Sequence, residues 1–272
     1  MADPIRLLVC DIDGTLVRQD KSLSDAVRAA GQRVIEAGVP LALISARPPS
    51  GIGWLAKELG SDSPLAAFNG GTLFRSNGDI LIDWQVPRQI ADTVLPMLSR
   101  PDVTPWVFAR GRWFVADPGN PHVARERIAS RQDPVVRDNF ADLLPAIDKM
   151  VAVSDVSGAL DTVEAEVRSA AGHAVTILRS QPYYLDITHT QANKGDGVIA
   201  LADLIGVPLS ATAVIGDMDN DLPMFAQAGL SIAMGQAPDA VKAAADHVTT
   251  SNEEDGVAHA IETYILPAIA KG

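Results

Sequence analysis

The sequence predicts an α/β fold in which a doubly wound, Rossmann-like parallel sheet is interrupted by an inserted α+β module. In the first and last thirds of the chain, short and continuously apolar runs alternate with stretches of helical periodicity. The middle third does not show this alternation. Apolar runs without alternation are typical of strands buried on both faces of a parallel sheet. We therefore expect residues 1–82 and 189–272 to form one core domain and residues 83–188 to form an insertion.

The first third begins with an apolar run at residues 7–10 that predicts a buried strand. A stretch with helical spacing follows at 24–37, and a second apolar run lies at 39–44. A strand, a helix and a strand in this short distance form one βαβ unit, which is normally parallel and right-handed. A further helix at 52–59 and a short strand at 65–68 continue the pattern.

The middle third contains a predicted hairpin, in which strands at 106–109 and 112–115 flank a Gly-containing turn. The rest of the insertion predicts helices at 121–130 and 160–171 and strands at 150–153, 175–178 and 184–187. The earlier alternation then returns, with helices predicted at 195–205, 222–228, 241–245 and 256–269 and strands at 212–215 and 230–233. The last third therefore completes the sheet that the first third begins.

The composition predicts a protein with a full apolar core and no nucleic-acid partner. Of the 272 residues 47% are hydrophobic, and the formal net charge is −12. Such a charge disfavours nucleic acid and anionic membranes, but it allows one local pocket to be positive. The single cysteine, Cys10, has no partner for an internal disulfide. Its apolar strand favours a buried hydrophobic role over a nucleophilic one.

The sequence shows neither the pattern of a signal peptide nor that of a membrane-spanning helix. The first residues lack the basic and then apolar order of a signal peptide, and no run of about 18 apolar residues predicts a membrane-spanning helix. We therefore expect a cytoplasmic protein with no membrane partner. Both a monomer and a homodimer are compatible with the sequence.

Two carboxylates stand where the first strand should end. Asp11 and Asp13 are two residues apart, so in an extended chain their side chains point the same way, and Gly14 then allows a tight turn. Ligands of open α/β sheets bind at the carboxyl ends of the strands. We therefore expect both carboxylates to face a site. The alternative, an Asp-Gly turn that merely closes a strand, is common.

Polar groups also follow other predicted strands. Ser45 ends the second strand, Asp217 ends a late one, and Lys194 precedes a helix. Taken one at a time, each residue has a simpler explanation: Ser45 could merely cap a turn, and Lys194 could be a solvated lysine on the surface. The run 217–221 resembles the start of a calcium-binding loop, but Leu222 occupies its sixth position, where such loops have Gly.

Taken together, these segments resemble the haloacid dehalogenase superfamily, and specifically its Cof-type phosphatases with an inserted α+β cap. The resemblance covers the first and last thirds of the chain well, while the insertion matches only in length and order of elements. One departure is Ala46, where many relatives have Gly, and we expect little effect from it. The motifs that carry the resemblance, in order, are Asp11-Ile12-Asp13-Gly14-Thr15, Ser45 with Arg47, Asn193-Lys194-Gly195, Gly216-Asp217-Met218-Asp219-Asn220-Asp221, and the C-terminal runs 233–237 and 252–258.

The resemblance implies a magnesium-dependent phosphatase. Asp11 and Asp217 would supply carboxylates to Mg2+, and Asp13 its backbone carbonyl. Asp11 would attack phosphorus and become an aspartyl phosphate. The Asp13 side chain would protonate the leaving alkoxide and then take a proton from the attacking water.

The remaining motif residues receive supporting roles from the same resemblance. Ser45 and Lys194 would bind the phosphoryl oxygens, and Asp221 would hold Lys194 and a metal-bound water. Asn220 would touch the phosphoryl group or the surroundings of the metal, and Thr15 would support the loop. Two further strand-end residues, Arg47 and Asn69, lie near the same site, and a direct role for either stays open. Arg47 could pair with a second anionic group of the substrate or with the cap.

Three readings of the function compete. The first is hydrolysis of a small phosphorylated metabolite, such as a sugar phosphate or a phosphorylated cofactor. A phosphomutase or phosphotransferase on the same fold is the nearest alternative, and release of phosphate without an acceptor would separate the two. A non-catalytic metabolite-binding protein would be expected to have lost Asp11, Asp13, Lys194 or Asp217, and all four are present. The sequence does not name the substrate, because its selection would belong to the insertion.

Overall fold

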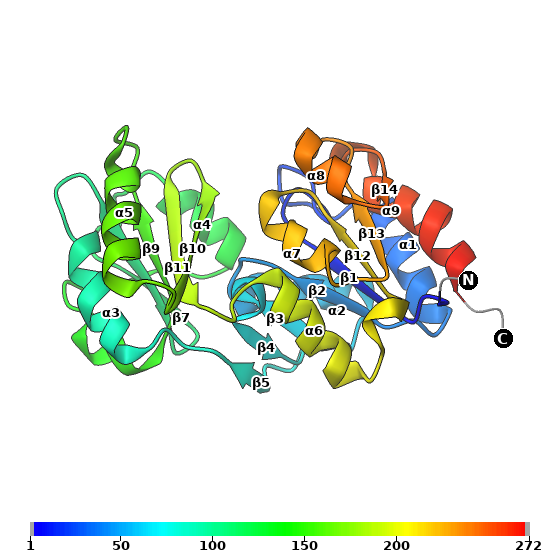
Figure 1. Ribbon diagram of the computed structural model, residues 1–272, viewed down its shortest axis with the longest axis horizontal. Helices are drawn as coiled ribbons and strands as arrows, with labels where there is room; N and C mark the ends of the chain where they lie inside the picture. The colour runs from blue at the N-terminus through cyan, green and yellow to red at the C-terminus, as the bar shows by residue number, and fades with distance from the viewer. Residues whose placement is uncertain (1–2, 270–272) are drawn as a thin grey trace.

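The computed structural model describes residues 3–269 and contains two sheets, which lie in separate lobes (Figure 1). The first sheet has the strand order β14-β13-β12-β1-β2-β3-β4-β5. Its pairs are parallel from β14 to β3, and β4 and β5 add two antiparallel strands at the edge. The strands are β1 (Leu7–Asp11), β2 (Leu41–Ile44), β3 (Leu65–Ala67), β4 (Thr72–Phe74), β5 (Ile80–Asp83), β12 (Thr212–Gly216), β13 (Leu230–Ala233) and β14 (His247–Val248).

Helices cover both faces of the first sheet, as a doubly wound fold requires. Successive residues of β1 alternate between the two apolar layers: Leu8 and Cys10 belong to one, Leu7 and Val9 to the other. One face is packed by α1 (Asp25–Glu36), α2 (Gly53–Leu59) and α9 (Gly256–Ala260), the other by α6 (Lys194–Ile205), α7 (Leu222–Phe225) and α8 (Asp239–Ala244). The predicted fold class is confirmed, and the continuous apolar run of β1 is explained by burial on both sides.

The second sheet is built from strands of the middle of the chain in the order β10-β11-β9-β6-β7-β8. Its pairs are antiparallel except for β7 with β8. The strands are β6 (Thr104–Ala109), β7 (Arg112–Val115), β8 (Val135–Val136), β9 (Ile147–Val153), β10 (Val175–Gln181) and β11 (Tyr184–His189); the helices are α3 (Arg88–Val94), α4 (Val123–Ser130) and α5 (Ala159–Ala171). Both α3 and α5 contribute to its own apolar cluster, so this sheet has a core of its own.

Several elements differ from the expectation. The first sheet continues through β4 and β5, which the polar turn between them concealed. The helix predicted over 256–269 is α-helical only as far as Ala260 and continues as a π turn and a 3-10 turn. The short strand predicted over 65–68 ends at Ala67, because Phe68 and Asn69 adopt left-handed backbone angles of +50° and +58°. Helix α3 and strands β8 and β14 were not expected.

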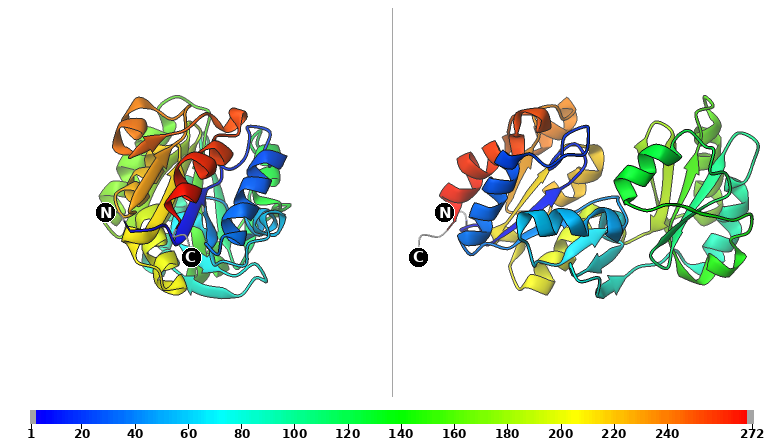
Figure 2. Two further views of the ribbon diagram at one scale, coloured as in Figure 1. Left: turned by 90° about the vertical axis from the view of Figure 1, so that its right-hand side faces the viewer. Right: turned by 180° about the vertical axis from the view of Figure 1, so that it is seen from behind.

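The two lobes are joined by two chain crossings, which can be followed in Figure 1 and in the right-hand view of Figure 2. Trp84 in the first crossing stacks on His189 at the start of the second, with ring centroids 5.2 Å apart. The ring of His189 thus packs at the junction of the two lobes. The lobes also contact each other away from these crossings, where Phe68 packs edge-on against Phe108 and Arg131 lies over the ring of Trp54. Between residues 3 and 269, no helix has both the length and the apolar character needed to span a membrane.

Candidate active site

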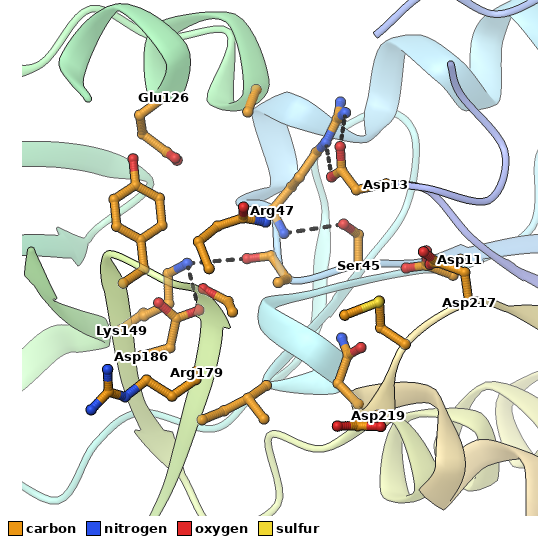
Figure 3. Close-up of a pocket in the computed structure, with 18 of the residues that line it drawn as sticks. Asp11, Asp13, Ser45, Arg47, Glu126, Lys149, Arg179, Asp186, Asp217 and Asp219 are labelled. Carbon is orange, nitrogen blue, oxygen red and sulfur yellow. Dashed lines mark hydrogen bonds and ion pairs between the residues drawn. The ribbon is translucent and has the colours of Figure 1, made fainter. Parts of the chain in front are cut away.

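The carboxyl ends of neighbouring strands in the first sheet place the predicted residues together. Asp11 is the last residue of β1, Ser45 directly follows β2, and Asp217 directly follows β12. Because β1 pairs with both β12 and β2, these three side chains share one edge of the sheet (Figure 3). Cys10 is buried in β1, and burial raises its pKa well above its usual value, so the thiol is not a nucleophile.

Three buried carboxylates surround the end of β1. Oxygen atoms of Asp11, Asp217 and Asp221 lie within 4.8 Å of one another. Lys194 reaches them from the first turn of α6, whose N-cap Asn193 accepts a hydrogen bond from the Asp196 amide at 2.9 Å. The Nζ atom of Lys194 donates to Asp11 at 2.5 Å and to Asp221 at 2.6 Å, and only 1% of the Lys194 side chain is exposed. Lys194 is thus a buried site residue and not a surface lysine.

The charges of this cluster do not balance. Burial raises the pKa of Asp11 well above its usual range, Lys194 lowers it, and the neighbouring carboxylates of Asp221 and Asp217 raise it further. Burial and the Asp221 charge raise the pKa of Asp217 to about 7. Three carboxylates with one ammonium group leave an excess of negative charge in a buried place. A divalent cation with a preference for oxygen ligands fits this donor set, because it would offset that excess.

The hydrogen bonds of Asp221 distinguish it from the other two carboxylates. Its Oδ1 accepts from Lys194, and its Oδ2 accepts from the backbone amides of Asp217 and Met218 at 2.8 and 3.0 Å. Both oxygens are therefore occupied by protein donors. Asp217 is supported differently, because one of its oxygens accepts a hydrogen bond from the Thr15 hydroxyl at 3.2 Å. Asp11 and Asp217 have the freer lone pairs for a metal ion.

Glycine is required where the loops approach these carboxylates. Gly14 has a φ of +82°, and a Cβ there would lie 2.2 Å from Oδ2 of Asp217. At Gly216 a Cβ would lie 2.4 Å from Cγ of Asp221. Both distances are far inside van der Waals contact, so any larger residue would displace a carboxylate.

Asp13 is held by two cations. Arg47 donates from Nε to Oδ2 at 2.6 Å and from Nη2 to Oδ1 at 2.7 Å, and Lys21 donates to Oδ1 at 2.6 Å. Burial alone would raise the pKa of Asp13, but the hydrogen bonds and charges of Arg47 and Lys21 hold it well below its usual range. Arg47 thus pairs with Asp13 and not with the cap. Lys21 was not predicted as a site residue; it lies in a loop and has a left-handed backbone φ of +69°.

The remaining predicted residues lie around this centre. The Ser45 hydroxyl is buried and accepts a hydrogen bond from the Arg47 amide at 3.2 Å (Figure 3). Asn220 donates to Oδ1 of Asn69 at 3.4 Å, so the two amides form a pair. Asn220 lines the cavity described below, together with Ser45, whereas Asn69 does not. Asn69 is therefore placed behind Asn220.

The C-terminal motifs support the loop after β1. Gln236 donates from Nε2 to the Gly14 carbonyl at 2.6 Å. Its Oε1 accepts from the Asn252 amide at 3.1 Å, and the Asn252 side chain donates to the Val17 carbonyl at 2.9 Å. Residues from the end of the chain thus fix the backbone that carries Asp11 and Asp13.

A cavity of about 300 Å³ opens onto these groups, and its far wall comes from the second sheet and α4. Sequence reasoning missed this wall, although Lys149 and Asp186 are charged residues in mostly apolar strands, which is a usable signal. Lys149 donates to the Ala46 carbonyl at 3.2 Å and to Asp186 at 3.4 Å. The wall residues are Arg125, Glu126, Ala129, Lys149, Leu178, Arg179, Ser180, Gln181, Tyr184 and Asp186.

The acidic cluster and the buried lysine lie at the carboxyl edge of a doubly wound sheet, which is where α/β enzymes bind their ligands, and a cavity separates them from the second lobe. The model of the haloacid dehalogenase-like hydrolase family matches residues 8–261, so the chain belongs to this family. The predicted superfamily is confirmed.

Individual relatives agree with this assignment. A haloacid dehalogenase-like hydrolase from Bacteroides thetaiotaomicron has 30% identity and a TM-score of 0.87, with 95% of this chain and 98% of that chain covered. The 5-amino-6-(5-phospho-D-ribitylamino)uracil phosphatase YitU of Bacillus subtilis is 27% identical over 95% of this chain and 97% of its own length. A sugar phosphatase of subclass IIB, at 23% identity and a TM-score of 0.82 over 97% of this chain and all of that one, shares the fold. The predicted enzyme class, a phosphatase of the haloacid dehalogenase type, is confirmed.

Proposed function

We propose that this enzyme is a cytoplasmic, Mg2+-dependent phosphatase that hydrolyses a small phosphorylated metabolite through an aspartyl-phosphate intermediate. Residues 1–82 and 189–272 would form its catalytic core, and residues 83–188 a cap that encloses the substrate. The observation that carries the proposal is the buried cluster of Asp11, Asp217 and Asp221 with Lys194 at the end of β1. The phosphatase name of the B. subtilis relative, whose substrate is a phosphorylated ribityl compound, supports a metabolite of this size.

The metal ligands would be Asp11, Asp217 and the backbone carbonyl of Asp13. When bound, Mg2+ would neutralise the carboxylates and the phosphate, so that the two anions can approach. The Asp11 carboxylate attacks phosphorus, and the bond from phosphorus to the leaving oxygen breaks. Water then attacks phosphorus in the aspartyl phosphate, which releases inorganic phosphate and restores Asp11.

Asp13 would exchange protons with both the leaving group and the water. Arg47 and Lys21 favour its ionised form, which is the form that takes a proton from water. Protonation of the leaving alkoxide needs the acid form, so one of the two cations must first turn from Asp13 to the anionic substrate. Arg47 is suited to this exchange, because its guanidinium group binds carboxylate and phosphate in the same two-pronged geometry.

Other residues would hold the transferring group and the ligands. Lys194 and the Ser45 hydroxyl would bind phosphoryl oxygens and stabilise the charge that they carry in the transition state. Asp221 fixes Lys194, and Thr15 fixes Asp217, by the hydrogen bonds described above. Asn220 lines the cavity beside them and would touch the phosphoryl group or the water around the metal.

The test uses Asp11→Asn with a matched control. Asn keeps the shape of Asp11 and an oxygen that can accept from Lys194, so we expect a folded protein without phosphatase activity. Asp92→Asn, on the exposed side of α3, should keep the activity of the wild type. The assay measures phosphate released from a panel of phosphorylated metabolites with no acceptor added, with Mg2+ and with excess chelator. Release by folded Asp11→Asn, or by the wild type in chelator, would contradict the proposal, and release only with an acceptor would indicate a phosphotransferase.

A further inference from the structure

We propose that a second cavity, at the junction of the two lobes, binds a small oxyanion that bridges them. This cavity has a volume of about 410 Å³ and adjoins the active-site cavity at Arg47 and Lys21, which line both. The inference goes beyond the proposed phosphatase function and does not depend on it. It rests on the origin of the wall residues, on their charges, and on donor groups that lack a partner.

Both lobes contribute to the wall of the second cavity. The first lobe supplies the loop 20–23, Arg28 of α1 and Trp54 of α2. The second lobe supplies Ile128 of α4 and Arg131, which directly follows that helix. The guanidinium carbon of Arg131 lies 3.8 Å from the ring centroid of Trp54. A ligand in this cavity therefore contacts both lobes.

Hydrogen bonds between the lobes fix the position of Arg131 beside Trp54. The Ser50 hydroxyl, in the turn before α2, donates to the Ser130 carbonyl at 2.5 Å. Gln132 donates from Nε2 to the Ser50 hydroxyl at 2.7 Å. Because Ser130 and Gln132 flank Arg131 in the sequence, the backbone of Arg131 is held against the first lobe on both sides.

The wall of the second cavity is positively charged, although the chain as a whole has a formal net charge of −12. Cationic side chains outnumber carboxylates by two among the residues that line it, and the Asp13 carboxylate, which Arg47 and Lys21 share, reduces this excess to one. A positive cavity on an acidic protein selects small anions, because the surrounding surface repels large ones. The cations are Lys21, Arg28, Arg47 and Arg131, and the carboxylates are those of Asp20 and Glu58.

Two donor groups of the wall residues lack an acceptor. Within residues 3–269, neither Nε1 of Trp54 nor Nε of Arg28 makes a hydrogen bond, and both atoms are buried. The nearest carboxylate oxygen of Glu58 lies 3.6 Å from Nε of Arg28, which is too long for a hydrogen bond. Buried donors without a partner are uncommon and costly, and acceptor oxygens of a ligand would satisfy them.

Arg131 supplies a free cation from the second lobe. In the part of the chain that the structure describes, its guanidinium group has the Trp54 ring as a neighbour but no carboxylate partner. A guanidinium group binds two oxygens of a phosphate or carboxylate in parallel. Trp54 and Arg28 offer single donors from the opposite side. These donors match a small ligand with several acceptor oxygens on one centre, which is a phosphate or a carboxylate.

The test measures the binding of inorganic phosphate by calorimetry in excess chelator and at constant ionic strength, with malonate as a second probe. Without a metal ion, the acidic cluster beside Lys194 repels an anion from the active-site cavity. Trp54→Phe removes a donor of the first lobe, and Arg131→Gln removes the cation of the second. The tighter of the two probes tells whether the ligand group is a phosphate or a carboxylate.

Two matched controls separate this site from its surroundings. Arg127→Gln removes another cation of α4, which pairs with Asp133 at 2.7 Å and lines neither cavity. Ser45→Ala changes a residue that lines only the active-site cavity. Both variants should bind the probe with the affinity of the wild type.

We expect saturable binding of a single anion to each wild-type chain. Trp54→Phe should weaken it about 10–100-fold, because a hydrogen bond to a charged acceptor is lost. Arg131→Gln should weaken it about 2–5-fold, because an exposed cation contributes less than a buried donor.

Three results would overturn the inference. The first is that neither probe shows saturable binding. The second is wild-type affinity in Trp54→Phe or in Arg131→Gln, because a bridging ligand must contact both lobes. The third is a comparable loss of affinity in Ser45→Ala, which would place the anion in the active-site cavity. No metal or substrate is present in these measurements, so they stand whether or not the protein proves to be a phosphatase.

Discussion

Asp148 should make the stability of this protein depend on pH. It lies near the start of β9, beside the first crossing between the lobes, where the Val86 amide donates to the Ile147 carbonyl. Burial and the Asp83 charge raise its pKa from 3.8 to about 8, and a hydrogen bond from Gln85 lowers it in part. Because the folded pKa lies above the unfolded one, the cost of ionising Asp148 is absent below about pH 4, grows as the pH rises, and is complete above about pH 8. At about 1.4 kcal/mol per pH unit, the cost is about 3 kcal/mol at pH 6 and of order 5 kcal/mol above pH 8.

Asp148→Asn removes this cost, because the amide has nearly the shape of the protonated acid and no charge. Urea unfolding from pH 4 to pH 9 should show equal stability at pH 4 and a growing advantage of the variant at higher pH. Asp83→Asn, which removes the neighbouring like charge, should give a smaller advantage. A difference between wild type and Asp148→Asn that is the same at every pH would refute the reasoning.

Three further predictions concern the site. In Asp13→Asn, single-turnover release of alcohol should slow far more for a sugar phosphate than for p-nitrophenyl phosphate, by up to about 10²–10⁴-fold, because only the alkoxide needs a proton; equal losses would contradict this. Gly14→Ala should raise the Mg2+ concentration for half-maximal activity by about 10–100-fold, because its Cβ displaces the Asp217 carboxylate, and an unchanged titration would count against it. Lys194→Met should lower the stability of the metal-free protein by about 3–5 kcal/mol in urea unfolding, since Asp11 and Asp221 lose their buried partner; a loss below about 1 kcal/mol would show that the pair is not needed.

The sequence was most informative where backbone rules alone decide the outcome. Parallel strands bring their carboxyl ends to one edge, so Asp11, Ser45 and Asp217 could be placed together before any contact was known. Lys194 could be added because it begins a helix of the same sheet. The roles assigned to these residues remain predictions, although their positions agree with them.

The remaining parts of the site depend on contacts between distant segments. The Asp13 partners were hidden because Lys21 lies in an irregular loop and the direction of the Arg47 side chain is set by the fold. The cap wall was hidden because Tyr184 and Asp186 face the cavity only through the way the two lobes meet. Alternation along β11 could show that they share a face, but not what that face would meet.

The position of β1 in the first sheet has a consequence for the order in which the enzyme is made. Its neighbour β2 is synthesised soon after it, but its other neighbour, β12, begins at Thr212. The second sheet has all its strands between Thr104 and His189, so it can be completed on the ribosome while β1 is paired only with β2 and still lacks β12. The carboxylates of Asp217 and Asp221 and the supporting Gln236 and Asn252 emerge after the whole second sheet. A nascent chain therefore completes its second sheet before the acidic cluster beside Asp11 can assemble.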